Sequence, residues 1–245
     1  MEAMIFAAGL GTRLQPLTNN KPKALVEVAG KPLLEHCIEK LIQSHCTKIV
    51  VNIHHFGEQI IDFLGSKKFD VEIIISDERN LLLDTGGGLK NAAKAFSGKK
   101  PVLVHNVDVF SNIDLQQLYN IHQHGNALAT LAVASRNTSR YLLFDKKDNL
   151  VGWKNQKTGE TLWANPIAEH SAVPLAFSGI HVVSPEIFEL LPDIGPYPIV
   201  PQYVHLATNH TIKAFEHTAE QWIDVGKPDT ITLAQEFIEK HIDKQ

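Results

Sequence analysis

The sequence has few cysteines and no long apolar run. Only two of its 245 residues are cysteine, which is too few for a disulfide framework and is typical of chains kept in a reducing compartment. The longest apolar stretch, residues 172–183, is interrupted by Pro174 and falls short of the roughly 18 residues that a membrane helix needs. Glu2 stands where a signal peptide carries positive charge. We therefore expect a cytoplasmic protein without a membrane span.

The sequence also lacks an excess of positive charge and the bias of a disordered chain. It has 23 Lys and Arg against 27 Asp and Glu, a net charge of −4, which argues against a general nucleic-acid binder. Its 44% hydrophobic content excludes the disordered class. No linker or repeat divides it, so we predict one domain, residues 1–245, with a regular half (1–135) and a more irregular half (136–245).

Short apolar runs alternate with helical stretches in the first half. The expected strands are residues 3–8, 48–53, 71–76, 101–106 and 127–134, and the expected helices are residues 32–45, 58–64, 88–96 and 115–124. Nearly continuous apolar strands separated by helices are typical of parallel sheets whose two faces are both covered. The pattern predicts an α/β fold with a mostly parallel central sheet.

The second half is less regular. Residues 141–145 and 149–153 flank a hairpin signal, and residues 154–171 are polar and predict a loop. Further strands are expected at 177–183 and 210–216, and helices at 184–191 and 227–240, with Ser184 as an N-cap and Pro185 in the first turn. The proline-rich residues 192–201 are expected to be irregular.

A glycine-rich loop follows the first strand. A Gly-rich turn at this place in an α/β sheet is where phosphates commonly bind, because bare backbone N–H groups approach them closely. The dinucleotide fingerprint fails, since Leu14 stands at its third glycine, and no Gly-Lys-Ser/Thr follows. Pro16 and Pro22 exclude an early long helix. The sequence therefore predicts an extended phosphate-binding loop.

The positive charge for this loop must come from side chains. Residues 9–31 carry Arg13, Lys21, Lys23 and Lys31 against Glu27, a local charge of +3 in an acidic chain. A locally basic loop suits a triphosphate, whose charge is about −4. An ordinary surface turn with solvated lysines is the alternative.

Five segments carry a resemblance to a known family. Residues 7–36, AAGLGTRLQPLTNNKPKALVEVAGKPLLEH, resemble the signature of sugar-1-phosphate nucleotidyltransferases, and further matches are DTGGG (84–88), residues 106–108, FSGIH (177–181) and WIDVGKP (222–228). The resemblance spans nearly the whole chain. It implies a three-layer α/β/α, Rossmann-like nucleotide-diphospho-sugar transferase fold, with nucleotide bound by the first half and sugar by the second.

Two acids are candidates for a metal site. Asp108 follows the expected strand 101–106, at an end of the sheet where ligands bind, and Mg²⁺ prefers oxygen ligands from one or two carboxylates plus phosphates. Asp224 is flanked by apolar Ile223 and Val225, where a charge is costly unless it is paired. The resemblance implies that the two acids jointly hold Mg²⁺, the expected cofactor. Val107 departs from the glycine that relatives often have there.

The resemblance also implies roles for other residues. Arg13 suits the β- and γ-phosphates and Lys23 the α-phosphate and the sugar phosphate, which makes these two the expected catalytic residues. The expected nucleotide-binding residues are Ala8, Gly9, Gly11, Thr12, Arg13, Lys23, Thr85, Gly86, Gly87 and Gly88, and the expected sugar-binding residues are Asn106, Ser178 and Gly179.

Some features depart from the family or have structural alternatives. The Glu-Lys-Pro segment of many relatives is missing, and either Lys154 or Lys157 could supply its lysine. Trp153 is expected to pack the hairpin. None of the 13 histidines forms a zinc pattern with the cysteines, so we expect them to be structural.

The resemblance implies that the substrates are a nucleoside triphosphate and a sugar-1-phosphate, and we expect no nucleic-acid or membrane partner. The DTGGG and DVG segments most resemble those of enzymes that use UTP and N-acetylmuramate-1-phosphate. The alternatives are GTP with mannose-1-phosphate or a heptose-1-phosphate, CTP with phosphocholine, and a catalytically silent nucleotide-sugar sensor.

Overall fold

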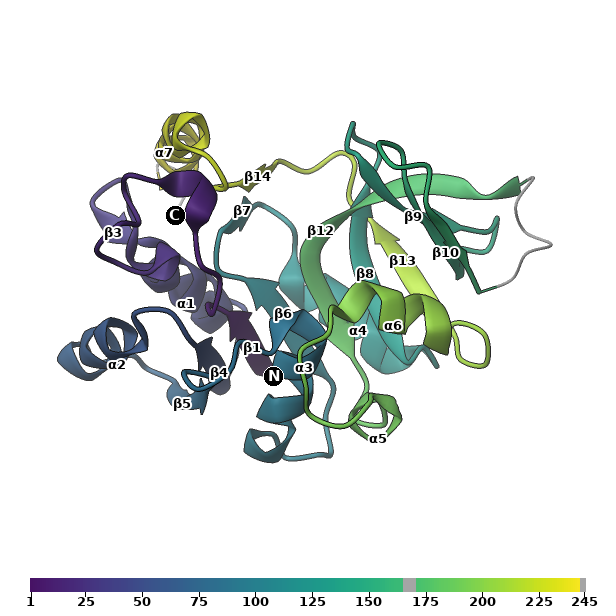
Figure 1. The fold of residues 1–245 in the computed structure, drawn as a ribbon, viewed down its shortest axis with the longest axis horizontal. Coiled ribbons are helices and arrows are strands. Elements are labelled where there is room, and N and C mark those ends of the chain that lie inside the picture. The colour runs from purple at the N-terminus through teal and green to yellow at the C-terminus, as the bar shows by residue number, and fades with distance from the viewer. Residues whose placement is uncertain (165–170, 243–245) are drawn as a thin grey trace.

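A large mixed sheet forms the centre of the molecule (Figure 1). The computed structural model describes residues 1–164 and 171–242. The ten-stranded sheet has the order β11 (Thr161–Trp163), β10 (Leu150–Asn155), β9 (Arg140–Phe144), β12 (Val173–Val183), β6 (Val102–Asn106), β1 (Glu2–Phe6), β4 (Lys48–Ile53) and β5 (Glu72–Asp77). A branch adds β8 (Ala129–Ala134) beside β12, and β13 (Ile212–Glu216) beside β8.

Strand direction divides this sheet into two regions. β5, β4, β1 and β6 are parallel neighbours, and Met4 lies opposite both Val50 and Val104. β12 runs antiparallel to β6, β8 and β9, and the hairpin strands β9, β10 and β11 are antiparallel as well. We call β5–β4–β1–β6 the parallel region and β12–β9–β10–β11 the antiparallel region. The predicted α/β fold is confirmed.

Apolar side chains alternate between two helical layers, as the pleat of a strand requires. Ala3 and Ile5 pack on one face with α1 (Leu33–Gln43), α2 (Gly57–Ser66), α4 (Leu115–His124) and α7 (Pro228–Ile242). Met4 faces the other layer, with α3 (Asp84–Ala92), α5 (Ile187–Leu190) and α6 (Ile199–Leu206). Within residues 1–164 and 171–242, every helix is too short or too polar to cross a membrane.

Two small sheets lie beside the large one. β7 (Val109–Ser111) pairs antiparallel with β14 (Trp222–Asp224), and β2 (Glu27–Val28) pairs with β3 (Lys31–Pro32). α7 lies beside the N-terminal segment that carries β2 (Figure 1). The β7–β14 pair brings Asp224 next to Asp108, although the two residues are far apart in the sequence. A hydrogen bond from the Val225 N–H to the Asp108 carbonyl, at 2.9 Å, continues this pairing.

Several expected boundaries were wrong. The proline-rich stretch contains the start of α6, because Pro198 precedes the helix and Pro201 falls in its first turn, where no N–H is needed. β12 begins at Val173, and β11 lies within the predicted loop 154–171, of which residues 165–170 are outside the described residues.

Candidate active site

A cleft of about 600 Å³ opens at the carboxyl ends of β1, β4 and β6. Ligands of α/β sheets bind at this end. Nine of the residues predicted for the site line the cleft, namely Ala8, Gly9, Gly11, Thr12, Arg13, Lys23, Thr85, Asn106 and Asp108. The cleft is therefore the candidate active site.

The glycine loop has the extended form that the sequence predicts. It contains only two short 3₁₀ turns, η1 (Thr12–Leu14) and η2 (Lys23–Leu25), instead of a long helix. Gly11 has φ +67°, and an added Cβ would lie 3.0 Å from both Lys23 Cβ and Thr18 Cγ2. Thr18 Oγ1 donates to the Gly11 carbonyl at 2.9 Å. Glycine is required here because the loop folds back on the segment that carries Lys23.

Sequence reasoning missed two buried polar residues that hold this loop. Asn52 Oδ1 accepts hydrogen bonds from the N–H groups of Ala7 at 2.7 Å and Ala8 at 3.3 Å. Asn52 Nδ2 donates to Glu78 Oε1 at 2.8 Å, and burial raises the pKa of Glu78 although this hydrogen bond opposes the shift. The available signal was a lone amide inside the apolar strand KIVVNI.

The three glycines of DTGGG lie inside a helix, which corrects the expected loop before residue 88. The N–H groups of Gly86 and Gly87 both donate to the Tyr197 carbonyl, at 2.9 and 3.2 Å. A Cβ at Gly87 would lie 1.9 Å from the Gly195 carbonyl oxygen. These glycines allow α3 to pack against the segment before α6, and their amides are already satisfied within the chain.

Gly88 and Thr85 have different surroundings. A Cβ at Gly88 would lie 2.8 Å from Glu78 Oε1, so this glycine makes room for the buried carboxyl. Thr85 lines the cleft while its Oγ1 accepts a hydrogen bond from the Ile199 N–H at 3.0 Å. Base contact by residues 85–88 remains a prediction.

The two candidate metal acids lie on either side of one lysine. Lys23 Nζ hydrogen bonds to Asp108 Oδ2 and lies 4.0 Å from Asp224 Oδ1. Gly226 lets the Arg13 guanidinium and the Asp224 carboxylate lie close to the backbone, because a Cβ on this glycine would be 3.1 Å from Arg13 Nη1, Arg13 Nη2 and Asp224 Oδ1. The structure thus brings together the four charged residues that the sequence singled out.

Asp224 is in an environment that disfavours its negative charge. Burial, followed by the negative charge of Asp108, raises the pKa of Asp224, while Lys23 and Arg13 oppose the shift. Its Oδ1 is buried and has no hydrogen-bond partner among the described residues. A free carboxylate oxygen beside a second carboxylate fits a divalent cation. Within the described parts of the chain, no group of three acidic, histidine or cysteine ligands occurs, so substrate phosphates and water would complete the coordination.

The expected sugar-binding residues lie beside these acids. Gly179 has φ +72°, and a Cβ on it would lie 2.5 Å from Asn106 Nδ2, so the Asn106 side chain packs directly on the glycine backbone. Ser178 is fully buried and its Oγ is hydrogen bonded to His217 Nε2 at 2.7 Å. Its carbonyl accepts a hydrogen bond from Trp222 Nε1 at 2.8 Å. Asn106 lines the cleft, whereas Ser178 is buried and does not line it.

The basic residues of the hairpin lie elsewhere. Lys154 and Lys157 are both exposed and do not line the cleft. Trp153 packs against the core beneath the antiparallel region, as predicted. The choice between the two lysines therefore stays open.

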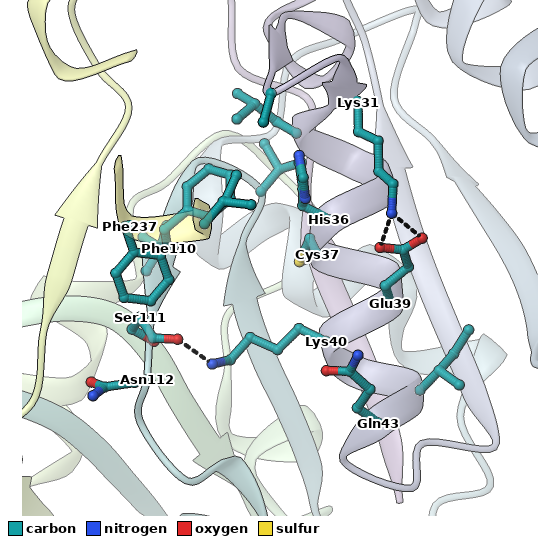
Figure 2. Close-up of a pocket in the computed structure, with 16 residues that line it drawn as sticks. Lys31, His36, Cys37, Glu39, Lys40, Gln43, Phe110, Ser111, Asn112 and Phe237 are labelled. Atoms are coloured by element: carbon teal, nitrogen blue, oxygen red, sulfur yellow. Dashed lines mark hydrogen bonds and ion pairs between the residues drawn. The ribbon is translucent and has the colours of Figure 1, made fainter. Parts of the chain in front are cut away.

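A second cavity, of about 690 Å³, lies between α1, β7 and α7 (Figure 2). Lys40 extends across it from α1 and donates to the carbonyls of Ser111 and Ile113. Burial lowers the pKa of Lys40 to about 8. This cavity contains none of the predicted site residues, and its lysine ties α1 to the strand that follows Asp108.

Comparisons with known proteins identify the family. Residues 2–241 match the Nucleotidyl transferase family. The chain is 34% identical to N-acetylmuramate alpha-1-phosphate uridylyltransferase of Caulobacter vibrioides, covering 95% of each chain. It is 31% identical to the protein of that name in Neisseria meningitidis serogroup B, covering 96% of this chain and 97% of the other.

The fold also matches solved structures. A crystal structure of HddC from Yersinia pseudotuberculosis complexed with GMP-PN superposes with a TM-score of 0.76 at 23% identity, covering 97% of this chain and 99% of the other. At that identity the likeness supports the fold alone.

Proposed function

The chain belongs to the nucleotidyl transferase family, and from that membership we propose that it transfers a uridylyl group from UTP to N-acetylmuramate α-1-phosphate, with release of pyrophosphate. Its activity as a sugar-1-phosphate nucleotidyltransferase follows from the family and its relatives. The finer choice of UTP and N-acetylmuramate phosphate rests on the two relatives that are similar over nearly their whole length.

The observation that carries the chemistry is the meeting of Arg13, Lys23, Asp108 and Asp224 at one cleft. An oxygen of the sugar phosphate attacks the α-phosphorus of UTP, and pyrophosphate leaves. The attacking phosphate is already an anion, so no protein base is needed. The protein must instead hold two mutually repelling anions together and neutralise the charge that develops on the leaving group.

The basic residues divide this task. Arg13, whose forked guanidinium suits phosphate oxygens, holds the β- and γ-phosphates as they depart. Lys23 is a flexible point charge that moves from Asp108 and Asp224 to the α-phosphate when substrates bind. Asp108 and Asp224 would hold Mg²⁺, which when bound polarises phosphate oxygens and fixes their relative orientation.

The test is a pyrophosphate-release assay with Mg²⁺ and each of four nucleoside triphosphates, combined with a panel of sugar-1-phosphates. We expect the highest kcat/KM with UTP and N-acetylmuramate-1-phosphate. A higher value with GTP and mannose-1-phosphate or a heptose-1-phosphate, or with CTP and phosphocholine, would overturn the substrate assignment. No turnover with any pair would refute the enzymatic role and favour a nucleotide-sugar sensor.

A further inference from the structure

Arg136 lies at the same edge of the sheet as the acids, although no sequence motif marks it. It follows the carboxyl end of β8 by two residues. β12 runs antiparallel to both β6 and β8, so β6 and β8 point in the same direction. Their carboxyl ends therefore face the same side, where Asn106 ends β6 and Asp108 follows it.

The Arg136 side chain is held in a defined position. Its guanidinium carbon lies 3.8 Å from the ring centroid of Trp222, and its Nη2 donates to the Phe177 carbonyl at 2.7 Å. The Trp222 indole N–H in turn donates to the carbonyl of Ser178. Since Gly179 follows Ser178 and touches Asn106, the guanidinium is fixed next to the expected sugar-binding residues.

No carboxylate in residues 1–164 or 171–242 is close enough to form an ion pair with this guanidinium. Its buried Nε has no hydrogen-bond acceptor among the described residues. Only one of its several N–H donors has an acceptor in the part of the chain that the structure describes. Burial lowers the pKa of Arg136, with the charge of Asp224 opposing the shift. A partly buried and unpaired cation is costly, and an anion supplied by a ligand would offset that cost.

The anion that would pair with Arg136 is separate from the nucleotide phosphates and from the reacting sugar phosphate. Arg13 and Lys23 line the nucleotide cleft, and Lys23 lies at the two acids where the reacting phosphate must be. Arg136 does not line that cleft and lies on the β8–β12 side of the acids. Its neighbours are the expected sugar-binding residues Ser178 and Gly179, so a ligand group that reaches Arg136 would belong to the sugar of the acceptor.

We propose that Arg136 is a specificity-determining residue that binds an acidic substituent on the sugar of the acceptor and selects sugar-1-phosphates that carry one. A carboxylate is the group expected, because the planar guanidinium donates to it through paired N–H groups. Trp222 positions the guanidinium by covering one of its faces. The inference rests on the proposed function and deepens it.

The test compares two acceptors that differ by one lactyl ether group, which carries the carboxylate. N-acetylmuramate-1-phosphate is N-acetylglucosamine-1-phosphate with an added lactyl acid. In Arg136→Gln we expect kcat/KM for the first to fall about 10- to 100-fold, the range for loss of a hydrogen-bonded charge. For N-acetylglucosamine-1-phosphate, kcat/KM should stay within about 3-fold of wild type, and the KM for UTP should not change. Arg136→Lys should recover part of the selectivity, since it keeps the charge but loses the fork.

Arg140→Gln is the matched control. Arg140 is exposed on β9 and should leave the ratio of the two kcat/KM values unchanged. Equal losses with both acceptors in Arg136→Gln, or no loss with either, would overturn the inference while leaving the function intact. Retained turnover of N-acetylglucosamine-1-phosphate shows that the variant is folded. A wild-type chain that turns over neither acceptor refutes the proposed function and this inference together.

Discussion

The two sides of the candidate site are built in different ways. On the parallel side, one continuous segment, residues 7–23, supplies the loop that lines the cleft, and Asn52 holds it by its backbone. On the antiparallel side, Arg136, Gly179 and Trp222 come from three separate segments, and Gly179 packs against Asn106 at the end of β6. The first side is an extended backbone loop and the second is a set of packed side chains.

This difference separates two kinds of mutational effect. Changes on the parallel side and at the acids remove groups that every nucleotidyl transfer needs, so they should reduce turnover with all acceptors. Changes on the antiparallel side alter how one acceptor is held. They should therefore act mainly on acceptor KM, acceptor choice or stability.

The largest effect is expected for Asp108→Asn. Loss of this carboxylate removes one of the two proposed metal ligands and the partner of Lys23, so kcat should fall about 1000-fold with every acceptor. Steady-state pyrophosphate release measures this, and circular dichroism checks the fold. Asp114→Asn is the control, because Asp114 Oδ1 caps α4 by accepting from the Gln117 N–H and asparagine caps equally well. Substantial turnover by Asp108→Asn would contradict the metal assignment.

A smaller loss is expected for Arg13→Ala. The variant lacks the guanidinium beside Gly226 and Asp224, so kcat/KM for the nucleotide should fall about 100-fold. Arg140→Ala, which removes an exposed arginine, should leave the value near wild type. An unchanged kcat/KM in Arg13→Ala would remove this residue from the phosphate site.

On the antiparallel side, Gly179→Ala should raise the acceptor KM about 10-fold with little change in the KM for nucleotide. The added Cβ would lie 2.5 Å from Asn106 Nδ2 and displace that side chain. Gly159→Ala is closely matched, because Gly159 has φ +76° but an added Cβ would meet nothing within 4 Å. Both variants lose about 1 kcal/mol of stability to the backbone conformation. Only Gly179→Ala should change acceptor binding, and equal KM values in the two variants would exclude a role for Asn106.

An effect expected on stability alone, with no effect on turnover, concerns pH and His181 of β12. Burial lowers the pKa of His181 to about 3, and neither ring nitrogen has a partner among the described residues. The unfolded chain binds a proton below pH ~6.5 that the folded chain does not bind, so stability is lost as pH falls from there toward 3. Between pH 7.5 and 5 this loss is about 2 kcal/mol.

His181→Leu should remove that part of the pH dependence. Urea unfolding at pH 7.5 and pH 5 measures it, and the variant should lose less stability than wild type between the two. His105, whose pKa burial lowers to about 4, should keep contributing in both proteins. The same pH dependence in variant and wild type would show that His181 is not the group responsible.

Much of the fold could be predicted because the parallel region is encoded locally. Strands such as residues 48–53 are nearly continuous apolar runs, and apolar side chains from this strand pack on both faces of the sheet. The antiparallel region was harder, since β11 and the first part of β12 are polar or exposed and depend on their neighbours for pairing. α6 was missed because its prolines occupy positions where a helix tolerates them.

Some residues of the candidate site could not be found from the sequence alone. Asn52 and Glu78 have no motif, and their hydrogen bonds to residues 7–8 and to each other exist only after β1, β4 and β5 are side by side. Arg136 likewise gains a role only when Trp222 is folded against it. The glycines of DTGGG were recognised, but their packing partner, the segment at residues 195–197, lies more than a hundred residues away.

By itself the sequence determined the α/β fold and the form of the glycine loop, because each depends on local spacing and residue type. Its resemblance to a known family marked four charged residues as candidates for the site. Only the tertiary structure brought Asp224 beside Asp108, through the short β7–β14 pair and the hydrogen bond from Val225. Only the tertiary structure placed the Arg136 guanidinium against Trp222 at that edge, with no ion-pair partner among the described residues. Those results depend on contacts between distant segments, and the free energy of such contacts cannot be assigned from either segment alone.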